Sequence, residues 1–155
     1  MTTTQPKMTD TSLTVERTIQ APIERVFRAF TDPEEIAKWY HPGPMTTEVT
    51  TWEAQEGGAF DITMIASPEM ELEEGDPGRY RTTGTFREVQ PNERLVHTWR
   101  WEGMDDEESL VTVELEAVEE GTHVTLTHTK LADRESVESH AEGWGSCLEN
   151  LAQHV

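Results

Sequence analysis

The chain of 155 residues has little cysteine, little positive charge and no run of eighteen apolar residues. A lone Cys147 excludes an internal disulfide and agrees with a reducing compartment. Without a long apolar run, the sequence predicts no membrane-spanning helix. The first twelve residues are rich in threonine and lack the basic and apolar regions of a signal peptide. We therefore expect a cytosolic protein.

Negative charge dominates, because 31 Asp and Glu residues face 12 Lys and Arg and give a formal net charge of −19. Such a charge repels phosphate backbones and anionic lipid headgroups, so nucleic acids and membrane surfaces are excluded as expected partners. The acidic residues are spread along the chain, and the run Glu69–Asp76 reads as a solvated loop because it lacks a calcium-loop pattern. A high-salt cytoplasm favours this kind of surface, which makes a halophilic origin a testable hypothesis.

The length fits a single domain, which we place at residues 13–155 after a disordered lead-in at residues 1–12. Apolar residues make up only 34% of the chain, yet five Trp, four Phe and six Met are present. A few large side chains should therefore build the core, and such cores can enclose irregular space.

Alternating apolar and polar residues predict strands, and two short helical patterns follow the first strand. Asp32 and Pro33 mark the start of the second helix, with Glu35 at the spacing of a capping box. Short polar connections join the later strands, which predicts an antiparallel meander, with Gly84 as a bend or bulge. The predicted strands are Leu13–Ile19, Val49–Glu53, Phe60–Ala66, Arg79–Glu88, Arg94–Glu102, Leu110–Val118 and Thr122–Thr129.

The last helix, expected from Asp133 to His154, carries an apolar seam at steps of three and four residues. Gly143 and Gly145 flank Trp144 in this helix, and each costs about 1 kcal/mol relative to alanine. Either the backbone approaches a surface closely there, or space is left beside the indole. A helix that lies over a curved sheet with a cavity between them explains both features.

Motifs spread from Leu13 to Leu151 resemble one known family in their order and spacing. They are Val15–Ile19, Ala21–Phe27, Thr31-Asp32-Pro33 with Trp39, Gly57–Phe60, Gly84-Thr85-Phe86 with Pro91, Arg94-Leu95-Val96, Thr98-Trp99, Gly121-Thr122, Leu126-Thr127-His128 and Gly143-Trp144. The chain resembles the START-like superfamily, and within it the bacterial homologues of the C-terminal domain of the heat-shock-protein ATPase activator.

The resemblance implies a fold class: an α+β helix-grip fold with a curved antiparallel sheet of about seven strands. Two short helices follow the first strand, and a long C-terminal helix packs across the sheet. Related folds hold a lipid, hormone or polyketide between sheet and helix, and some act there as cyclases or dehydratases. Bacterial members commonly lack the co-chaperone's N-terminal domain, so chaperone activation does not follow.

On this fold, indoles, thioethers and other apolar groups are the expected ligand-binding residues, with no metal and no cofactor. The alternative is that these side chains only fill the core, since protein interiors are dense. The candidates are Trp39, Phe60, Ile62, Met64, Tyr80, His97, Trp99, Trp101, Met104, Trp144 and Leu148.

Strand alternation turns His97 and His128 inward among apolar neighbours, where a neutral imidazole can orient a carbonyl compound or act as a general base, with Tyr80 as donor. The alternative is a core histidine with a structural hydrogen-bond partner. His123 and His128 point to opposite faces of one strand, which removes them as a metal pair. Cys147 reads as a small buried hydrophobe.

Three functional hypotheses follow from these observations. The first is binding of a small hydrophobic or amphipathic molecule without catalysis. The second is an enzyme of the cyclase or hydrolase type that uses His97, His128 and Tyr80. The third is a protein-interaction module, similar to a co-chaperone, in which an exposed apolar loop, Trp39–Met45, contacts a protein partner.

Overall fold

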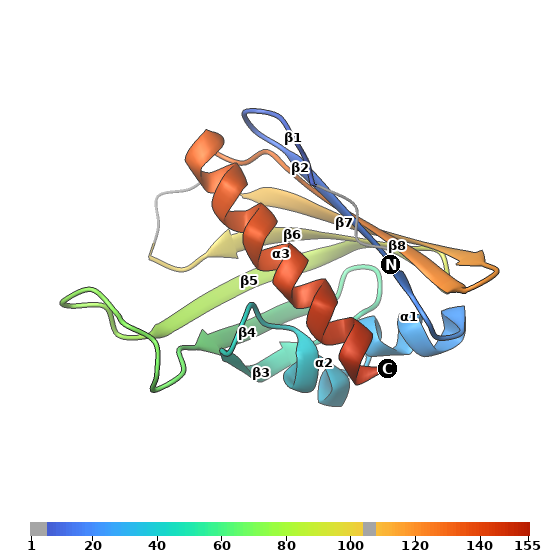
Figure 1. Ribbon diagram of the computed structural model, residues 1–155, viewed down its shortest axis with the longest axis horizontal. Coiled ribbons are helices and arrows are strands. Elements are labelled where there is room, and N and C mark those ends of the chain that lie inside the picture. Colours follow the sequence, from blue (N-terminus) through green and yellow to red (C-terminus); the bar gives the residue numbers. More distant parts are fainter. Residues whose placement is uncertain (1–5, 104–107) are drawn as a thin grey trace.

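The computed structural model describes residues 6–103 and 108–155, and it confirms the α+β helix-grip architecture (Figure 1). Its strands form one antiparallel sheet of eight strands in the order β1-β2-β8-β7-β6-β5-β4-β3, one strand more than expected. The strands are β1 (Lys7–Met8), β2 (Leu13–Ile19), β3 (Thr46–Trp52), β4 (Ala59–Ile65), β5 (Arg79–Gln90), β6 (Arg94–Trp101), β7 (Ser109–Val118) and β8 (Gly121–Thr129). The helices are α1 (Ile23–Thr31), α2 (Pro33–Trp39) and α3 (Arg134–His154).

The additional strand, β1, falls within the lead-in that the sequence predicted to be disordered. Lys7 pairs with Thr14 and Met8 pairs with Leu13, so β1 extends the sheet beyond β2. Thr9 closes the turn between them, because its hydroxyl accepts a hydrogen bond from the Ser12 amide at 3.0 Å. Two exposed residues carry no alternating pattern, which is why the sequence did not indicate this strand.

Helix α3 crosses the concave face of the sheet, as Figure 1 shows. The Asp133 side chain caps it by accepting a hydrogen bond from the Ser136 amide at 2.9 Å. The predicted seam is buried along its whole length, at Val137, Ala141, Trp144, Leu148 and Leu151, and Cys147 beside it is buried as well. Within the described ranges, no helix combines the length and apolarity needed to cross a membrane.

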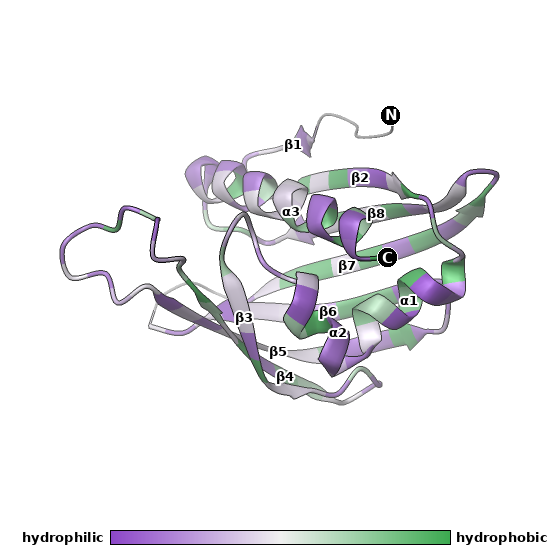
Figure 2. Cartoon of the chain, turned by 60° about the horizontal axis from the view of Figure 1, so that its bottom comes forward, coloured by the Kyte–Doolittle hydropathy of each residue, from purple (hydrophilic) through white to green (hydrophobic). Residues whose placement is uncertain are grey.

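Helices α1 and α2 carry the chain from β2 across to β3 at the far edge of the sheet, where α2 packs beside β3 (Figure 2). Asp32 caps α2 as predicted, since its carboxylate accepts a hydrogen bond from the Glu34 amide at 2.9 Å. Glu35 does not form the reciprocal half of a capping box. Its buried carboxylate instead contacts Arg25 at 2.6 Å and His154 at 3.0 Å, which ties α2 to α1 and to the end of α3.

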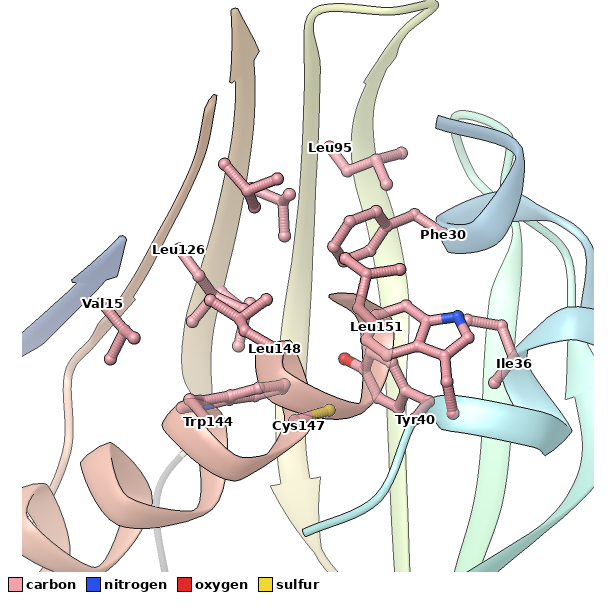
Figure 3. Close-up of a cluster of buried hydrophobic side chains, with 14 of the residues drawn as sticks. Val15, Phe30, Ile36, Tyr40, Leu95, Leu126, Trp144, Cys147, Leu148 and Leu151 are labelled. Carbon is pink, nitrogen blue, oxygen red and sulfur yellow. The ribbon is translucent and has the colours of Figure 1, made fainter. Parts of the chain in front are cut away.

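The core lies between the sheet, α3 and the short helices. Figure 3 shows Leu148 and Leu151 of α3 pointing toward Leu126 and Phe30. One face of each alternating strand is buried, at Phe60, Ile62, Met64, Phe86, Leu95, His97, Trp99, Val111, Val113, Leu115, Val124, Leu126 and His128. Tyr80 and Trp101 are only partly buried, which places them at the margin of this core.

The sequence predicted a bend or a bulge at Gly84, and no register shift falls there, so the bulge is absent. Gly84 pairs directly with Phe60, and a Cβ atom built on Gly84 would lie 2.3 Å from a carbon of the Phe60 ring and 2.1 Å from the Thr98 carbonyl oxygen. The register shift of this strand lies between Phe86 and Glu88. Gly84 is therefore required because an aromatic ring covers its backbone.

Candidate functional site

A pocket of about 810 Å³ lies between α3 and the end of the sheet where β4 and β6 finish and β5 begins. Its apolar lining comes mainly from large side chains of β4, β5, β6 and α3. These are Met64, Tyr80, Trp99, Trp101, Trp144 and Cys147. The remaining lining residues are Pro42, Thr63, Arg79, Arg81, Glu102, Ala132, Asp133, Glu135, Ser136, Ser139, His140 and Gly143.

Three indoles form a continuous aromatic wall. The ring of Trp99 lies 5.4 Å from that of Trp101 in a T-shaped arrangement and 5.1 Å from that of Trp144 in a tilted one. The Nε1 atom of Trp99 is a buried donor without a hydrogen-bond partner among the described residues. Such an orphan donor is uncommon in a native interior.

The indole of Trp144 is held in place by a buried hydrogen-bond chain. Its Nε1 donates to His128 Nδ1 at 3.0 Å, and His128 Nε2 lies 2.7 Å from the Ser109 hydroxyl. An indole N–H can only donate, so His128 Nδ1 accepts and the proton resides on Nε2. Nε2 therefore donates to Ser109, whose hydroxyl donates to the Trp99 carbonyl at 3.0 Å. Burial lowers the pKa of His128 well below its usual value, with a further contribution from His140, so the ring is neutral.

His140 supports Trp101 in a similar way. Trp101 Nε1 donates to His140 Nε2 at 3.1 Å, so the proton of this imidazole resides on Nδ1, which lies 2.8 Å from the Ser136 carbonyl oxygen. The bond joins β6 to α3 across the pocket. The imidazoles of His128 and His140 also meet edge to face at 4.9 Å.

His97 lies deeper in the core, and its side chain is not part of the pocket lining. Its Nδ1 bonds to the Thr98 carbonyl at 2.9 Å, and rings of Phe60, Phe86 and Trp99 surround it. Burial lowers the pKa of His97 to about 4, against a smaller opposing effect of the hydrogen bond to Thr98. His97 is thus a neutral core histidine with a structural partner.

Tyr80 borders the pocket with its hydroxyl turned to Asp76. The phenol donates to the two carboxylate oxygens at 2.9 and 2.7 Å. This hydrogen bond raises the pKa of Tyr80, with smaller contributions from burial and from the charge of Asp76. The phenol therefore stays protonated and bound at neutral pH.

The segment from Trp39 to Met45 is not an exposed apolar loop, in contrast to the prediction. Trp39, Tyr40 and Met45 are buried, and Trp39 Nε1 donates to the Ala29 carbonyl at 2.9 Å. Helix α3 holds the segment, because Asn150 donates to the His41 carbonyl at 2.8 Å and Ser146 accepts from the Gly43 amide at 2.5 Å. Of this segment only Pro42 reaches the pocket.

Cys147 is the one lining residue with a thiol. Its side chain is buried, and burial raises the pKa of the thiol, against a smaller effect of a hydrogen bond to the His41 backbone. A protonated thiol is a poor nucleophile, so Cys147 contributes apolar surface to the pocket. Among the described residues, no group of three His, Cys, Asp or Glu side chains has the geometry to hold a metal ion.

Comparison with known proteins gives the family. The profile of the activator of Hsp90 ATPase homolog 1-like proteins matches residues 20–155. The chain belongs to this family. A comparison with curated proteins found no match.

Solved structures of bacterial proteins share its fold. A Chromobacterium violaceum protein is 27% identical, with a TM-score of 0.80 over 92% of this chain and 96% of the other. The AHSA1 protein from Silicibacter pomeroyi is 26% identical, with a TM-score of 0.77 over 92% and 95%. A Mycobacterium smegmatis protein of 19% identity has a TM-score of 0.81 over 97% and 95%, and this likeness shows the fold alone.

In this member of the family, the pocket brings together only part of the predicted ligand-binding set. Met64, Tyr80, Trp99, Trp101 and Trp144 line it. Trp39, Phe60, Ile62, His97 and Leu148 are buried in the core and do not line it. Met104 lies outside the described residues.

Several pocket residues were missed from the sequence, of which His140 and Gly143 are the most informative. His140 lies four residues before Trp144, so one helical turn places both on the same face of α3. Gly143 lines the pocket, and a Cβ atom built on it would meet only the Pro42 side chain, at 3.8 Å. Of the two explanations for the glycines, the structure favours space beside the indole.

Proposed function

We propose that this protein binds a small hydrophobic or amphipathic molecule in the pocket beneath α3, without chemistry of its own. The observation that carries the proposal is the pocket of about 810 Å³ walled by three indoles. Its volume falls in the range of small-molecule sites, which are lined mainly by apolar and aromatic groups with a few polar ones. Family membership is consistent with such a role.

The polar contacts of the wall support a preorganised site. Trp144 and Trp101 are each fixed by an imidazole, of His128 and of His140, so the rings do not need to be ordered when a ligand arrives. Rigid aromatic walls lower the entropy cost of binding.

The two alternatives are less well supported. Catalysis by His97 and His128 would need both imidazoles to reach a bound carbonyl group, whereas His97 does not line the pocket and both ring nitrogens of His128 have partners. Docking of a protein partner through Trp39 and Met45 would need these side chains at the surface, but they are buried.

Native mass spectrometry of the protein from its own host tests the proposal first. A ligand should appear as a mass excess over the denatured chain, in a ratio near one to one. A clean ligand-free mass, both as purified and after exposure to a lipid and polyketide mixture, would contradict small-molecule binding.

A pocket-filling variant with a matched control locates the site. Gly143→Leu places a side chain in the pocket, whereas Gly145→Leu adds the same group on the same helix at a position that does not line it and has open space around its Cβ. Binding of the extracted molecule should fall at least tenfold in the first variant, about 1.4 kcal/mol, and stay near wild type in the second. Equal affinities in the two variants would place the ligand elsewhere.

A further inference from the structure

We infer that the ligand of this pocket carries a neutral carbonyl group, which accepts a hydrogen bond from the indole N–H of Trp99. The inference rests on the proposed function and adds the polar group by which the pocket recognises its ligand. It predicts that the pocket distinguishes a ketone from a hydrocarbon of the same shape.

Trp99 differs from the other four tryptophans in its hydrogen bonding. The indoles of Trp39 and Trp52 donate to backbone carbonyl oxygens of α1, at 2.9 and 3.0 Å. Those of Trp101 and Trp144 donate to imidazole nitrogens, at 3.1 and 3.0 Å. Trp99 Nε1 has no partner among the described residues, although this side chain lines the pocket and the residue is only 2% exposed. The wall of the pocket thus contains one buried donor that an outside acceptor can satisfy.

The packing around Trp99 leaves the pocket as the side from which a ligand can approach. The rings of Phe60, His97 and His128 pack against Trp99 at centroid distances of 5.8, 6.1 and 5.9 Å, and none of them lines the pocket. Neighbouring side chains cover Nε1, so the edge of a ring has to shift when an acceptor arrives. Trp101 contacts Trp99, lines the pocket and is only partly buried, so its ring can shift at the lowest cost.

A lone donor is best matched by a group that accepts without donating. A hydroxyl group would bring a donor of its own, which needs a second acceptor in the pocket. The two imidazole acceptors of the wall are occupied, because His128 and His140 each accept from an indole N–H. A carbonyl oxygen has no donor and therefore fits the single N–H of Trp99.

The acceptor is expected to be neutral, because a carboxylate is costly to bury without a cation beside it. The two arginines of the lining already have carboxylate partners. Arg79 donates to Glu48 at 2.8 Å, and Arg81 donates to Asp61 with two nitrogens at 2.9 and 2.6 Å. The net charge of −19 adds a further penalty for an anionic ligand.

A contact between the N–H and the face of a neighbouring ring is the competing explanation. Trp99 and Trp101 meet at 5.4 Å in a T-shaped arrangement, in which an N–H group can point at a ring face. Such a contact is weaker than a hydrogen bond to a carbonyl oxygen. If it satisfied the donor, a carbonyl probe would gain nothing at Trp99.

Two naphthalene probes of matched shape supply the test. Acetylnaphthalene carries a C=O group where isopropenylnaphthalene, substituted at the same ring position, carries C=CH₂. Equilibrium dialysis gives the dissociation constant of each probe, and the carbonyl preference is the constant of the hydrocarbon divided by that of the ketone. The hydrocarbon is the more hydrophobic probe, so the preference is compared between variants rather than taken from the wild type alone.

Variants at two positions of the same wall locate the acceptor. In Trp99→Phe the carbonyl preference should fall by at least about fivefold, because phenylalanine has no N–H to donate. The control is Trp101→Phe, which removes a neighbouring indole whose N–H is already bound to His140. The carbonyl preference should not fall in this control.

Nuclear magnetic resonance of the wild type gives a second measurement that does not depend on the folding of a variant. With isotope-labelled tryptophan, the indole N–H signal of Trp99 is assigned by its through-space contacts to the rings of Trp101 and Trp144. The signal should move downfield when the ketone binds, and less when the hydrocarbon binds.

The outcomes separate the inference from the proposed function. An unchanged carbonyl preference in Trp99→Phe, or an equal shift of the Trp99 signal with both probes, would overturn the inference and leave the proposed function in place. An equal fall in both variants would assign the preference to the aromatic wall as a whole and also overturn it. If neither probe binds, the molecule released from the native protein replaces them in the resonance experiment, and a molecule without a carbonyl group would overturn the inference. No binding of either probe, together with a clean ligand-free native mass, would remove both.

Discussion

Replacing His128 by leucine should lower the free energy of unfolding by about 2–4 kcal/mol. In the structure, His128 accepts from the Trp144 indole at 3.0 Å and bonds to the Ser109 hydroxyl at 2.7 Å. Leucine leaves the buried Trp144 N–H without an acceptor, which costs about 1–3 kcal/mol, and removes one neutral hydrogen bond of about 1 kcal/mol. Ser109 keeps the Trp99 carbonyl as acceptor, so it adds no second orphan.

A double-mutant cycle with Trp144→Phe isolates the contact. Phenylalanine has no N–H, so Trp144→Phe removes the donor that His128→Leu leaves without an acceptor. Urea unfolding at neutral pH should give a coupling energy of at least about 1 kcal/mol. The control is His123→Leu on the same strand, where a half-buried imidazole contacts Glu16 at 2.9 Å on the opposite face, and it should cost under about 1 kcal/mol. Additivity of His128→Leu and Trp144→Phe within about 0.5 kcal/mol would refute this assignment of the hydrogen bond.

Three further predictions concern stability. Glu35→Gln should cost about 1–3 kcal/mol at pH 7 by urea unfolding, since hydrogen bonds to a charged group are lost. Burial raises the pKa of Glu35, but Arg25 and His154 lower it more, so the folded pKa lies below the ordinary value of 4.5. The carboxylate's contribution to the free energy of unfolding is therefore present above about pH 4.5 and disappears as the pH falls through the folded pKa. If Glu35→Gln lowered the free energy of unfolding equally at pH 7 and pH 3, this assignment would be wrong. Gly84→Ala should lower the free energy of unfolding by about 1–3 kcal/mol, because its Cβ would overlap the Thr98 carbonyl oxygen at 2.1 Å. The control is Gly145→Ala, where a Cβ atom meets nothing within 4 Å, and it should raise the free energy of unfolding by about 0.5–1 kcal/mol. Urea titrations measure both changes. If the acidic surface reflects a high-salt cytoplasm, the melting temperature should rise between low and molar salt, and no rise would refute the halophilic hypothesis.

The arrangement of strands and helices could be predicted because each element has a regular period and a buried face. Val111, Val113 and Leu115 alternate with polar residues, and only one face of that strand can be apolar. The seam of α3 is equally constrained by the step of the helix. Periodicity predicts which face of a strand or helix each side chain occupies, and the buried residues lie on the predicted face at nearly every position.

The depth of a side chain below the pocket could not be predicted in the same way. His97 and Trp99 share the inward face of β6, yet Trp99 lines the pocket and His97 does not. The difference depends on where α3 crosses the strand, which is set by packing between elements distant in the sequence. Trp39 was misplaced for a related reason, because the partner that draws its indole inward is a backbone carbonyl of α1, at Ala29.

The segment after α2, in which Tyr40 and Met45 are buried but Gly43 and Pro44 are exposed, shows a second limit. Pro42, Gly43 and Pro44 carry a turn signal, and turns are usually exposed. The rings that precede the turn nevertheless pack inward, where Tyr40 meets Trp52 at 5.3 Å and Trp144 at 5.7 Å. Turn residues predict the path of the backbone, but they do not predict whether the neighbouring aromatic side chains pack into the core.

Three features that lower stability coincide at this pocket. Gly143 weakens α3 by about 1 kcal/mol relative to alanine although the site has room for a Cβ atom. Trp99 Nε1 is a buried donor with no described partner, which costs about 1–3 kcal/mol. The pocket itself leaves the faces around it without packing partners. A domain is stabilised by only about 5–15 kcal/mol, so features of this size are tolerated together mainly where occupancy by a ligand can offset them. Their convergence on one pocket therefore supports a binding role more strongly than the volume of the pocket does alone.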